Sequence, residues 1–538
     1  MTGLSAAPAV AQYVPGSDLT VSWTLDPRDF PDLFPRGPAF GARSVQAGMD
    51  LDGDGLKEIL FTTDETLAPE GPDPGVLDVY LYEATADNTY EYVWHYSHIP
   101  SNSLPALGHG DIDGDGLNEI YFGVPTINDD AEDLFVFEQD DSGVFPDEPT
   151  AVWGYDREGS ADFRPAGFQI VDVDNDGTQE LLTVSRRSGA RELVVATVNG
   201  DLNAFATFSI EFEAGEAILG GGGVYDVDVA DFDGDGLNEI WVNTWDNFSM
   251  AVWEATGADT YELQAELNGV NPVDDPGGFN SHDMLFDDVD GDGSLELFYP
   301  MTDGNLYFLD SLDDVSTLTF ESFTTIGMFD ATGSARGGAM GDIDGDGNVD
   351  IVASHGTAEI VSRIEYNGTG SYADSTSYTW SSLLESVGEP LDRYYPMTVT
   401  DDLDGDGLNE VVLTNLFASS PGQPMIIVVE AQAEATSTDD VAELPGAYIL
   451  RQNYPNPFNP STSISYVLPQ ADVVSVRVYN VMGQLVRTLV DGQASSPGSY
   501  EVQWNGRNDA GQLVSSGVYL YALETSQQRQ TRRMTLLK

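Results

Sequence analysis

The chain has 538 residues, no cysteine, and 91 acidic against 20 basic residues, which gives a formal net charge of −71. This length predicts several domains or one large repeat assembly, because a single core rarely grows beyond about 250–300 residues. So acidic a chain is not expected to bind nucleic acid or an anionic membrane, and the lack of cysteine excludes disulfides and thiolate metal sites.

The N-terminus carries a possible export signal. Residues 1–11 (MTGLSAAPAVA) end in the small-x-small pattern of a signal-peptidase site but lack a charged region and most of an apolar one. We interpret them as a signal-peptide remnant of an exported protein, with an Ala-rich flexible tail as the alternative. No apolar run approaches the roughly 18 residues of a membrane helix, so no transmembrane segment is expected.

The strongest signal is a repeated motif, D-x-D-x-D-G-x-x-(D/E). It occurs seven times, beginning at residues 50, 111, 172, 231, 288, 342 and 402. Its acids at positions 1, 3, 5 and 9, with the backbone carbonyl of position 7, form the set of hard oxygen ligands that Ca²⁺ prefers. Position 6 is always Gly, as a tight left-handed turn requires, and position 4 is Gly except for Asn175. We therefore predict about seven Ca²⁺ sites, one per repeat.

Five residues of each motif are the predicted metal ligands. They are Asp50, Asp52, Asp54, Leu56 and Glu58; Asp111, Asp113, Asp115, Leu117 and Glu119; Asp172, Asp174, Asp176, Thr178 and Glu180; Asp231, Asp233, Asp235, Leu237 and Glu239; Asp288, Asp290, Asp292, Ser294 and Glu296; Asp342, Asp344, Asp346, Asn348 and Asp350; and Asp402, Asp404, Asp406, Leu408 and Glu410. The loop is not an EF-hand, whose bidentate Glu stands at position 12 between two helices.

The sequence around the motifs is β-type. Each motif runs into a short stretch of Val, Ile or aromatic residues, as in residues 59–61 (ILF) and 240–242 (IWV), and no long helical period occurs in residues 1–434. About four such runs per repeat predict an all-β, seven-bladed β-propeller over residues 12–432. The last repeat lacks a fourth strand, so we predict that residues 18–24 complete blade 7 and close the ring.

These repeats resemble the FG-GAP/VCBS repeats of integrin-α-like propellers. The resemblance covers roughly residues 18–432 and rests on all seven motifs. It implies that a Ca²⁺ ion lies between the first two strands of each blade. Such propellers serve adhesion, ligand binding and scaffolding alike, so the resemblance does not select one function.

The chain changes character near residue 447. Residues 433–446 are small, polar and acidic and are interpreted as a linker. Residues 447–538 hold eight basic and five acidic residues, whereas 12 basic and 86 acidic residues precede them. Alternating runs such as 474–479 (VSVRVY) and 500–504 (YEVQW) predict a small Ig-like β-sandwich.

The tail carries four specific segments: residues 453–462 (NYPNPFNPST), 479–484 (YNVMGQ), 516–519 (SGVY) and 533–538 (RMTLLK). With them it resembles the C-terminal sorting domain of the type IX secretion system, and it is similar to the Ig-like module of flagellar hook-capping proteins. The resemblance implies the secretion machinery as a partner and a secreted or cell-surface location across a bacterial outer membrane. An Ig-like interaction domain that stays on the protein is the alternative.

No catalytic residue and no organic cofactor is predicted. The sequence contains no HExxH, G-x-S-x-G or phosphate-binding Gly-rich motif. The favoured function is therefore an exported binding or adhesion protein, whose unknown protein or glycan ligand is bound by long acidic loops such as residues 63–75 and 125–133. A secreted polysaccharide-active lyase or hydrolase is the alternative. The five histidines give it no support: His95, His98, His109, His282 and His355.

The metal motifs explain only part of the acidity, because they hold 28 of the 86 acids in residues 1–446. Lys occurs twice, at Lys57 and Lys538, beside 18 Arg. This composition is similar to that of proteins from salt-loving organisms, in which concentrated salt screens the repulsion between surface charges.

Overall fold

The computed structural model describes residues 12–16, 19–26, 41–64, 76–98, 105–124, 132–154, 163–185, 193–202, 207–215, 224–244, 249–267, 283–301, 305–328, 335–355, 360–387, 394–415, 424–432, 449–450, 453, 458, 462–468, 471–480, 482, 484–495, 498–527 and 529–536. The predicted signal-peptide remnant, the predicted linker and most of the loops 63–75 and 125–133 lie outside these ranges. Within them, no helix is long and apolar enough to cross a membrane.

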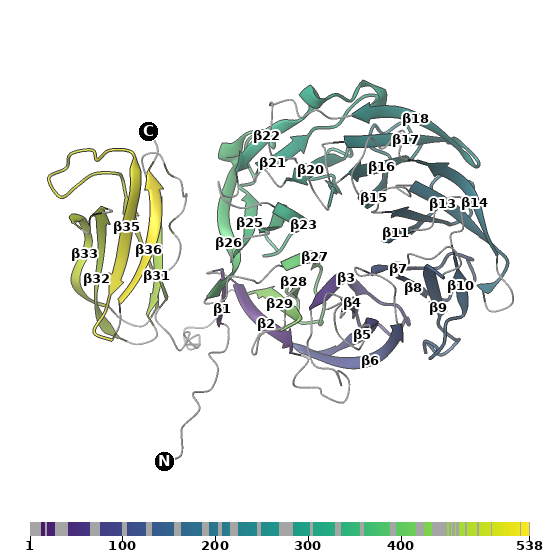
Figure 1. Ribbon diagram of the computed structural model, residues 1–538, viewed down its shortest axis with the longest axis horizontal. Helices are drawn as coiled ribbons and strands as arrows, with labels where there is room; N and C mark the ends of the chain where they lie inside the picture. The colour runs from purple at the N-terminus through teal and green to yellow at the C-terminus, as the bar shows by residue number, and fades with distance from the viewer. Residues whose placement is uncertain are drawn as a thin grey trace, which may run out of the picture. The chain divides into compact units, whose positions relative to one another are not determined.

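The chain divides into two compact units, residues 1–432 and residues 433–538. The expectation of an all-β chain is confirmed. In the first unit the described strands form seven antiparallel sheets, six of four strands and one of five, which lie around a common centre as in a β-propeller (Figure 1). The 3₁₀ helices among its described residues are η2 (Val315–Thr317), η3 (Phe320–Ser322) and η4 (Ser375–Ser377).

Sheets one to four follow one another along the chain, and each runs from an inner to an outer strand. The first holds β3 (Ala42–Met49), β4 (Glu58–Asp64), β5 (Leu77–Ala86) and β6 (Thr89–His98); the second β7 (Ala106–Gly110), β8 (Glu119–Gly123), β9 (Leu134–Glu138) and β10 (Ala151–Trp153); the third β11 (Pro165–Val171), β12 (Glu180–Ser185), β13 (Leu193–Asn199) and β14 (Thr207–Ala214); the fourth β15 (Val224–Ala230), β16 (Glu239–Thr244), β17 (Ser249–Gly257) and β18 (Thr260–Leu267).

Of the last three sheets, the sixth and the seventh each take in one strand from the N-terminus. The fifth holds β19 (Leu285–Asp287), β20 (Glu296–Pro300), β21 (Asn305–Leu309) and β22 (Thr324–Met328); the sixth β23 (Ala335–Gly341), β24 (Asp350–His355), β25 (Ile360–Tyr366), β26 (Tyr378–Val387) and β1 (Gln12–Pro15); the seventh β27 (Tyr394–Thr400), β28 (Glu410–Asn415), β29 (Ile426–Ala431) and β2 (Leu19–Leu25).

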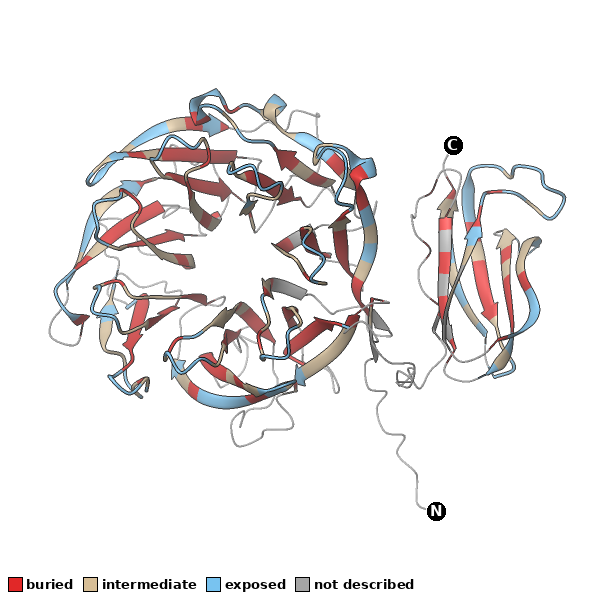
Figure 2. Ribbon diagram, turned by 180° about the vertical axis from the view of Figure 1, so that it is seen from behind, coloured by how far each residue is buried: buried red, intermediate tan, exposed pale blue. Residues whose placement is uncertain are grey.

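The burial of the strands follows their place in each sheet. The second and third strands carry nearly continuous apolar runs, and every residue of β8, β9, β28 and β29 is buried. Such runs suit strands whose two faces are both covered by neighbouring sheets. The outer strands alternate with exposed residues, as in β14 and β18, and Figure 2 shows this gradation.

Among the described residues of the first unit, seven large apolar clusters each join two neighbouring sheets. One of them joins the last sheet to the first, with Leu25 and Val428 packed against Ala42 and Phe61. The clusters therefore follow one another around the ring without a gap, and the core lies between the sheets.

The N-terminal segment spans two sheets. Strand β2 pairs antiparallel with β29, from Leu19 opposite Ala431 to Leu25 opposite Ile426, and supplies the fourth strand that the last repeat lacks. Strand β1 pairs with β26 of the sixth sheet, a pairing that the sequence did not indicate. The segment thus holds sheets six and seven together at their outer edges.

The tail unit is a small sandwich. One sheet holds β30 (Ile449–Leu450), β31 (Thr462–Leu468) and β34 (Gly498–Trp504), and the other β33 (Leu485–Ser495), β32 (Asp472–Asn480), β35 (Gly517–Glu524) and β36 (Arg529–Leu536). Their inner faces share one core that includes Phe458, Trp504 and Tyr521. Of the segment 453–462, Asn453 is described and buried, and its Nδ2 donates to Thr462 Oγ1 at 2.9 Å.

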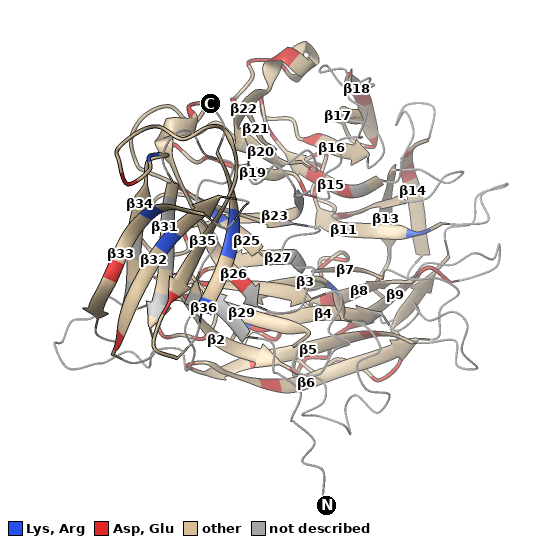
Figure 3. Cartoon of the chain, turned by 60° about the vertical axis from the view of Figure 1, so that its left-hand side comes forward, with Lys and Arg blue, Asp and Glu red and all other residues tan. Residues whose placement is uncertain are grey.

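The charges follow the two units. Acidic residues predominate in the first unit, whereas several basic residues lie on the tail strands (Figure 3).

Candidate metal centres

Each motif joins the inner strand of a sheet to its second strand. The ninth residue of every motif is the first residue of that second strand, so the strand ladder fixes its backbone. These residues are Glu58, Glu119, Glu180, Glu239, Glu296, Asp350 and Glu410. The position of the loop between the first two strands is the one that the sequence indicated.

The loop backbone repeats closely. At position 6 the glycines have φ between 85° and 94°, and at position 4 the residues have φ between 60° and 84°. L side chains rarely adopt such values, which explains the glycines. Asn175, the exception at position 4, has φ 60° and lies in the left-handed region that Asn tolerates.

Backbone N–H groups hold the carboxylates in place. In all seven loops the N–H of position 7 donates to the aspartate of position 5 at 2.8 Å. In all seven, the N–H of position 2 donates to one oxygen of the position-9 acid, at 2.6–3.1 Å. The loop therefore fixes two carboxylates through its own backbone.

The folded loops bring the predicted ligands together. Asp172, Asp174, Asp176 and Glu180 each offer an oxygen, and these oxygens lie within 4.8 Å of one another. The same holds for the four acids of the fourth loop and the four of the seventh, and for Asp50, Asp52 and Glu58 of the first. Four mutually repelling carboxylates at such distances are an arrangement that a cation stabilises.

In the absence of a cation, burial favours the protonated form of the position-9 acids. It raises the pKa of Glu58, Glu119, Glu180, Glu239 and Glu410 to about 8, and neighbouring aspartates raise the pKa further. Burial likewise raises the pKa of Glu296 to about 7. Lys57 belongs to the first motif, but its Nζ donates to the Asp401 carbonyl at 2.7 Å, and no ion pair with the carboxylates of these six copies is seen among the described residues. A bound divalent ion would therefore restore the ionised form.

Several oxygens in these loops are buried without a hydrogen-bond partner. In the fourth loop they are one oxygen each of Asp231, Asp233 and Glu239, and in the seventh one each of Asp404 and Glu410. An unpaired buried carboxylate oxygen is costly, so each needs a ligand. Oxygens of this kind, gathered in one loop, fit Ca²⁺.

The structure adds ligand candidates that the motif does not contain. Strand register places an acid of the third strand directly opposite position 9: Glu83 faces Glu58, Glu138 faces Glu119 and Glu430 faces Glu410. Glu83 lies within 4.8 Å of Asp52 and Asp54, and both carboxylate oxygens of Glu138 are buried without a partner. Aligning the repeats on the end of the third strand would have revealed these residues.

The third position of the motif also serves the neighbouring sheet. One carboxylate oxygen accepts a backbone N–H from the next sheet, at 2.6–3.0 Å, in four loops. The pairs are Asn88 to Asp404, Leu202 to Asp113, Asp259 to Asp174 and Val315 to Asp233. We call these four residues the shared aspartates. Their other oxygen faces the loop, and in Asp233 and Asp404 it is buried and unpaired.

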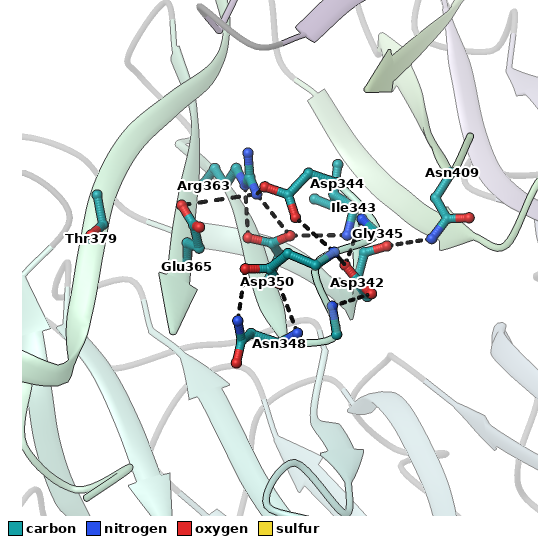
Figure 4. Close-up of polar contacts among 12 residues, drawn as sticks. Asp342, Ile343, Asp344, Gly345, Asn348, Asp350, Arg363, Glu365, Thr379 and Asn409 are labelled. Carbon is teal, nitrogen blue, oxygen red and sulfur yellow. Dashed lines mark hydrogen bonds and ion pairs between the residues drawn. The ribbon is translucent and has the colours of Figure 1, made fainter. Parts of the chain in front are cut away.

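The sixth loop differs from the others. Arg363, on the third strand β25, lies among its carboxylates and contacts Asp344 and Asp350 (Figure 4). Burial raises the pKa of Asp350 to about 7, although the guanidinium lowers it.

A second group of buried carboxylates lies on the inner strands. Asp226 and Asp228 lie on β15, and Asp283 lies just before β19, the inner strand of the next sheet. Burial raises the pKa of Asp228 to about 7 and of Asp283 to about 8, and the charge of Asp226 raises the pKa of Asp283 further. No motif or spacing in the sequence singles these three residues out.

The described histidines take no part in the loops. His109 Nδ1 lies 2.8 Å from Gln46 Oε1, and burial lowers the pKa of His109. His95 Nδ1 lies 2.6 Å from the Tyr92 hydroxyl, and its ring stacks on Tyr80. His282 lies outside the described residues.

Comparison with known proteins identifies one part of the chain. Residues 459–529 match the FlgD Ig-like domain family, which agrees with the Ig-like sandwich of the tail. No curated protein matches the chain.

Three similar solved structures are remote likenesses. BBS1N in complex with ARL6DN has 7% identity and a TM-score of 0.40, and the match covers 74% of this chain and 94% of that one. An α-L-arabinofuranosidase from Fusarium graminearum has 11% identity and a TM-score of 0.38, with coverage of 61% and 92%. A lectin from Agrocybe aegerita that recognises non-reducing terminal N-acetylglucosamine has 15% identity and a TM-score of 0.40, with coverage of 66% and 94%. Because these TM-scores are below 0.5, we infer neither fold nor function from these likenesses.

Proposed function

We propose that the first unit is a seven-bladed β-propeller of the FG-GAP/VCBS, integrin-α-like type whose loops bind Ca²⁺. The observation that carries the proposal is the recurring loop in which carboxylates converge and leave buried oxygens unpaired. In each filled loop the side chains of positions 1, 3, 5 and 9 and the carbonyl of position 7 would hold the ion. Ca²⁺ suits this set better than Mg²⁺, which demands strict octahedral geometry and retains water.

Isothermal titration of chelator-treated protein tests this proposal. We expect Ca²⁺ to bind in several equivalents and Mg²⁺ to compete weakly. Glu239→Gln should remove one equivalent, because it replaces the ionised group of the fourth loop by a neutral amide. Exposed Asp141→Asn is the matched control and should leave the number unchanged. Protein that binds no Ca²⁺ would refute the proposal.

We further propose that the tail directs export and that the propeller acts outside the cell as a binding or adhesion protein. The type IX sorting resemblance and the FlgD Ig-like match of residues 459–529 support this role for the tail. So does a hollow on the tail lined by Met482, Leu485 and Val518, of which Met482 is 74% exposed. Exposed apolar side chains around a hollow are typical of a recognition site.

Secretion assays in a type IX-competent host test the sorting role. The full-length chain should reach the medium or the cell surface, and a chain truncated after residue 446 should stay inside. Met482→Asp with Leu485→Asp should reduce export, whereas Val473→Asp, another exposed apolar position of the tail, should not. Secretion of the truncated chain would refute the sorting role.

The ligand of the propeller calls for a direct screen. A glycan array and a panel of cell-surface proteins, both with Ca²⁺ present, should show binding without turnover. A polysaccharide-active enzyme is the second candidate, and the carboxylates Asp226, Asp228 and Asp283 favour it, because a carboxyl kept protonated near neutral pH can act as a general acid. Cleavage products that disappear in Asp228→Asn would establish the enzyme instead.

A further inference from the structure

Arg363 distinguishes the sixth loop from the other six. It stands on β25 opposite Val352, two residues after the position-9 acid Asp350. At the corresponding place the other sheets carry a buried apolar residue. These residues are Leu81, Val136, Val195, Val252, Phe308 and Val428. The sixth sheet therefore has a positive charge at a position where each of the other six sheets has a buried apolar side chain.

The guanidinium lies among the predicted metal ligands, as Figure 4 shows. Arg363 Nε donates to Asp350 Oδ1 at 2.7 Å, and Nη2 donates to Asp350 Oδ2 at 3.0 Å and to Asp344 Oδ2 at 2.6 Å. The side chain of Arg363 is 2% exposed and that of Asp350 is 1% exposed. A two-pronged pairing of this kind is the strongest contact that a guanidinium makes with a carboxylate.

Every carboxylate oxygen of the sixth loop has a donor. Gly345 and Gly347 donate to the two oxygens of Asp342, and the backbone and side-chain nitrogens of Asn348 donate to the two oxygens of Asp346. The backbone of Asp346 and Arg363 serve the two oxygens of Asp344, and Arg363 serves both of Asp350. The fourth loop, by contrast, leaves three buried oxygens unpaired.

The sixth loop also changes its own acid. It alone has Asp at position 9, where the other six have Glu. The shorter side chain draws the carboxylate back by one methylene toward the strand, and Arg363 reaches it from the neighbouring strand. Glu365, the acid opposite Asp350 in the register, lies 3.9 Å from Arg363 Nη2, so it too faces the guanidinium.

We infer that the Arg363 guanidinium replaces the metal ion in the sixth loop, so that this loop folds without Ca²⁺ and the chain binds six ions. The inference rests on the proposed calcium binding of the other loops and differs from the expectation of one ion per blade. A divalent ion in the sixth loop would have to displace a buried charge of the same sign. The guanidinium stays protonated at any physiological pH, so this loop keeps its shape at any calcium concentration.

Native mass spectrometry of the full chain in excess Ca²⁺ tests the stoichiometry. We expect six ions bound. Seven ions would overturn the inference and leave calcium binding intact, whereas no bound ion would refute the proposed calcium function itself.

Two variants test the role of Arg363 directly. Arg363→Leu places in the sixth sheet the residue that the first sheet has as Leu81, and it should raise the count to seven. Arg477→Leu is the matched control, because Arg477 pairs with Asp491 in the tail, and it should leave six ions. A count that stays at six in folded Arg363→Leu would overturn the inference.

A second pair keeps the test decisive if Arg363→Leu does not fold. Asp350→Asn should leave the count of the folded chain at six, while Glu410→Gln at the same position of the seventh loop should lower it to five. The converse exchange, Val252→Arg with Glu239→Asp, should lower the count from six to five by building the arginine into the fourth loop. A loss of one ion in Asp350→Asn would overturn the inference.

Discussion

The two units of this chain differ in how their cores and loops are arranged. The first unit divides its core into seven clusters between sheets and gathers acidic loops at one end of each sheet. The tail packs two sheets around one core centred on residues such as Trp504 and has no repeat of the acidic loop. We therefore expect the first unit to depend on bound ions and on its N-terminal strands, and the tail to depend on its apolar interior.

Removal of Ca²⁺ should produce the largest difference between the stabilities of the two units. A ligand that binds only the folded state stabilises it by roughly 2.7 kcal/mol per site at a hundredfold excess over Kd. We expect a chelator to lower the melting transition of the first unit strongly and to leave that of the tail unchanged. Differential scanning calorimetry with and without Ca²⁺ measures both, and an unchanged first transition would contradict the comparison.

The N-terminal closure should come next in size. Deleting residues 12–25 removes β1 and β2, and should lower the first melting transition sharply while the tail transition stays. Within β2, Leu25 is 0% exposed, so Leu25→Ala should cost about 2–5 kcal/mol through lost burial and a cavity. Exposed Thr24→Ala is the control, with a change within about 0.5 kcal/mol. If Leu25→Ala and the unchanged protein unfold at the same denaturant concentration, the closure of the ring by β2 is contradicted.

The tail offers the reciprocal test. Trp504 is 1% exposed, packs edge-on against Tyr519, and donates from Nε1 to the Arg507 carbonyl at 2.9 Å. Trp504→Ala should lower the free energy of unfolding of the tail by about 3–5 kcal/mol, equally in Ca²⁺ and in chelator. Val473→Ala, at a 53% exposed position, is the control. A calcium-dependent effect of Trp504→Ala would blur the distinction.

A pH dependence independent of the loops should follow from Asp283. Its pKa is raised from the ordinary value of 3.8 to about 8 by burial and by Asp226. The folded state then holds a proton that the unfolded state has lost, so stability falls as pH rises from about 4 to about 8, by at most about 1.4 kcal/mol per pH unit. Asp283→Asn should flatten this slope in denaturant titrations, whereas exposed Asp141→Asn should not. An unchanged slope would mean that Asp283 ionises normally.

The smallest effect is expected at the contacts between loops. Asn238 Nδ2 donates to the Val173 carbonyl at 3.0 Å, and Asn118 Nδ2 donates to the Leu51 carbonyl at 2.6 Å, each from one loop to the preceding one. Asn238→Ala should cost about 0.5–1.5 kcal/mol in the first unit alone. Asn199→Ala, whose Nδ2 bonds within one sheet to Ser209, is the control. An effect on the tail transition would contradict this assignment.

Much of the architecture can be predicted from the sequence because each copy of the motif indicates where a strand begins. A glycine-containing acidic turn that runs directly into a β-type stretch predicts that a strand starts at the ninth residue of each motif, as at Glu58 and Glu239. The missing fourth strand of the last repeat likewise directs attention to residues 18–24. Such inferences need only local spacing and a count of strands.

What the sequence could not reveal depends on pairing between strands. Arg363 follows Asp350 by 13 residues, and only the register of β24 and β25 brings the two together. Glu83 and Glu138 reach the loops for the same reason. Strand β1 has no repeat to mark it, and its partner β26 lies more than 350 residues away. Residues that act across a ladder stay hidden until the ladder is known.

The shared aspartates give the ring a mechanical property. Because Asp113, Asp174, Asp233 and Asp404 each hold the next sheet with one oxygen, an ion that fixes the other oxygen also fixes the junction between sheets. Ion loss should thus loosen the joints between rigid blades and leave the ladders within each blade intact. Calcium binding would therefore stiffen the junctions between neighbouring sheets, and occupation of one loop should favour occupation of the next.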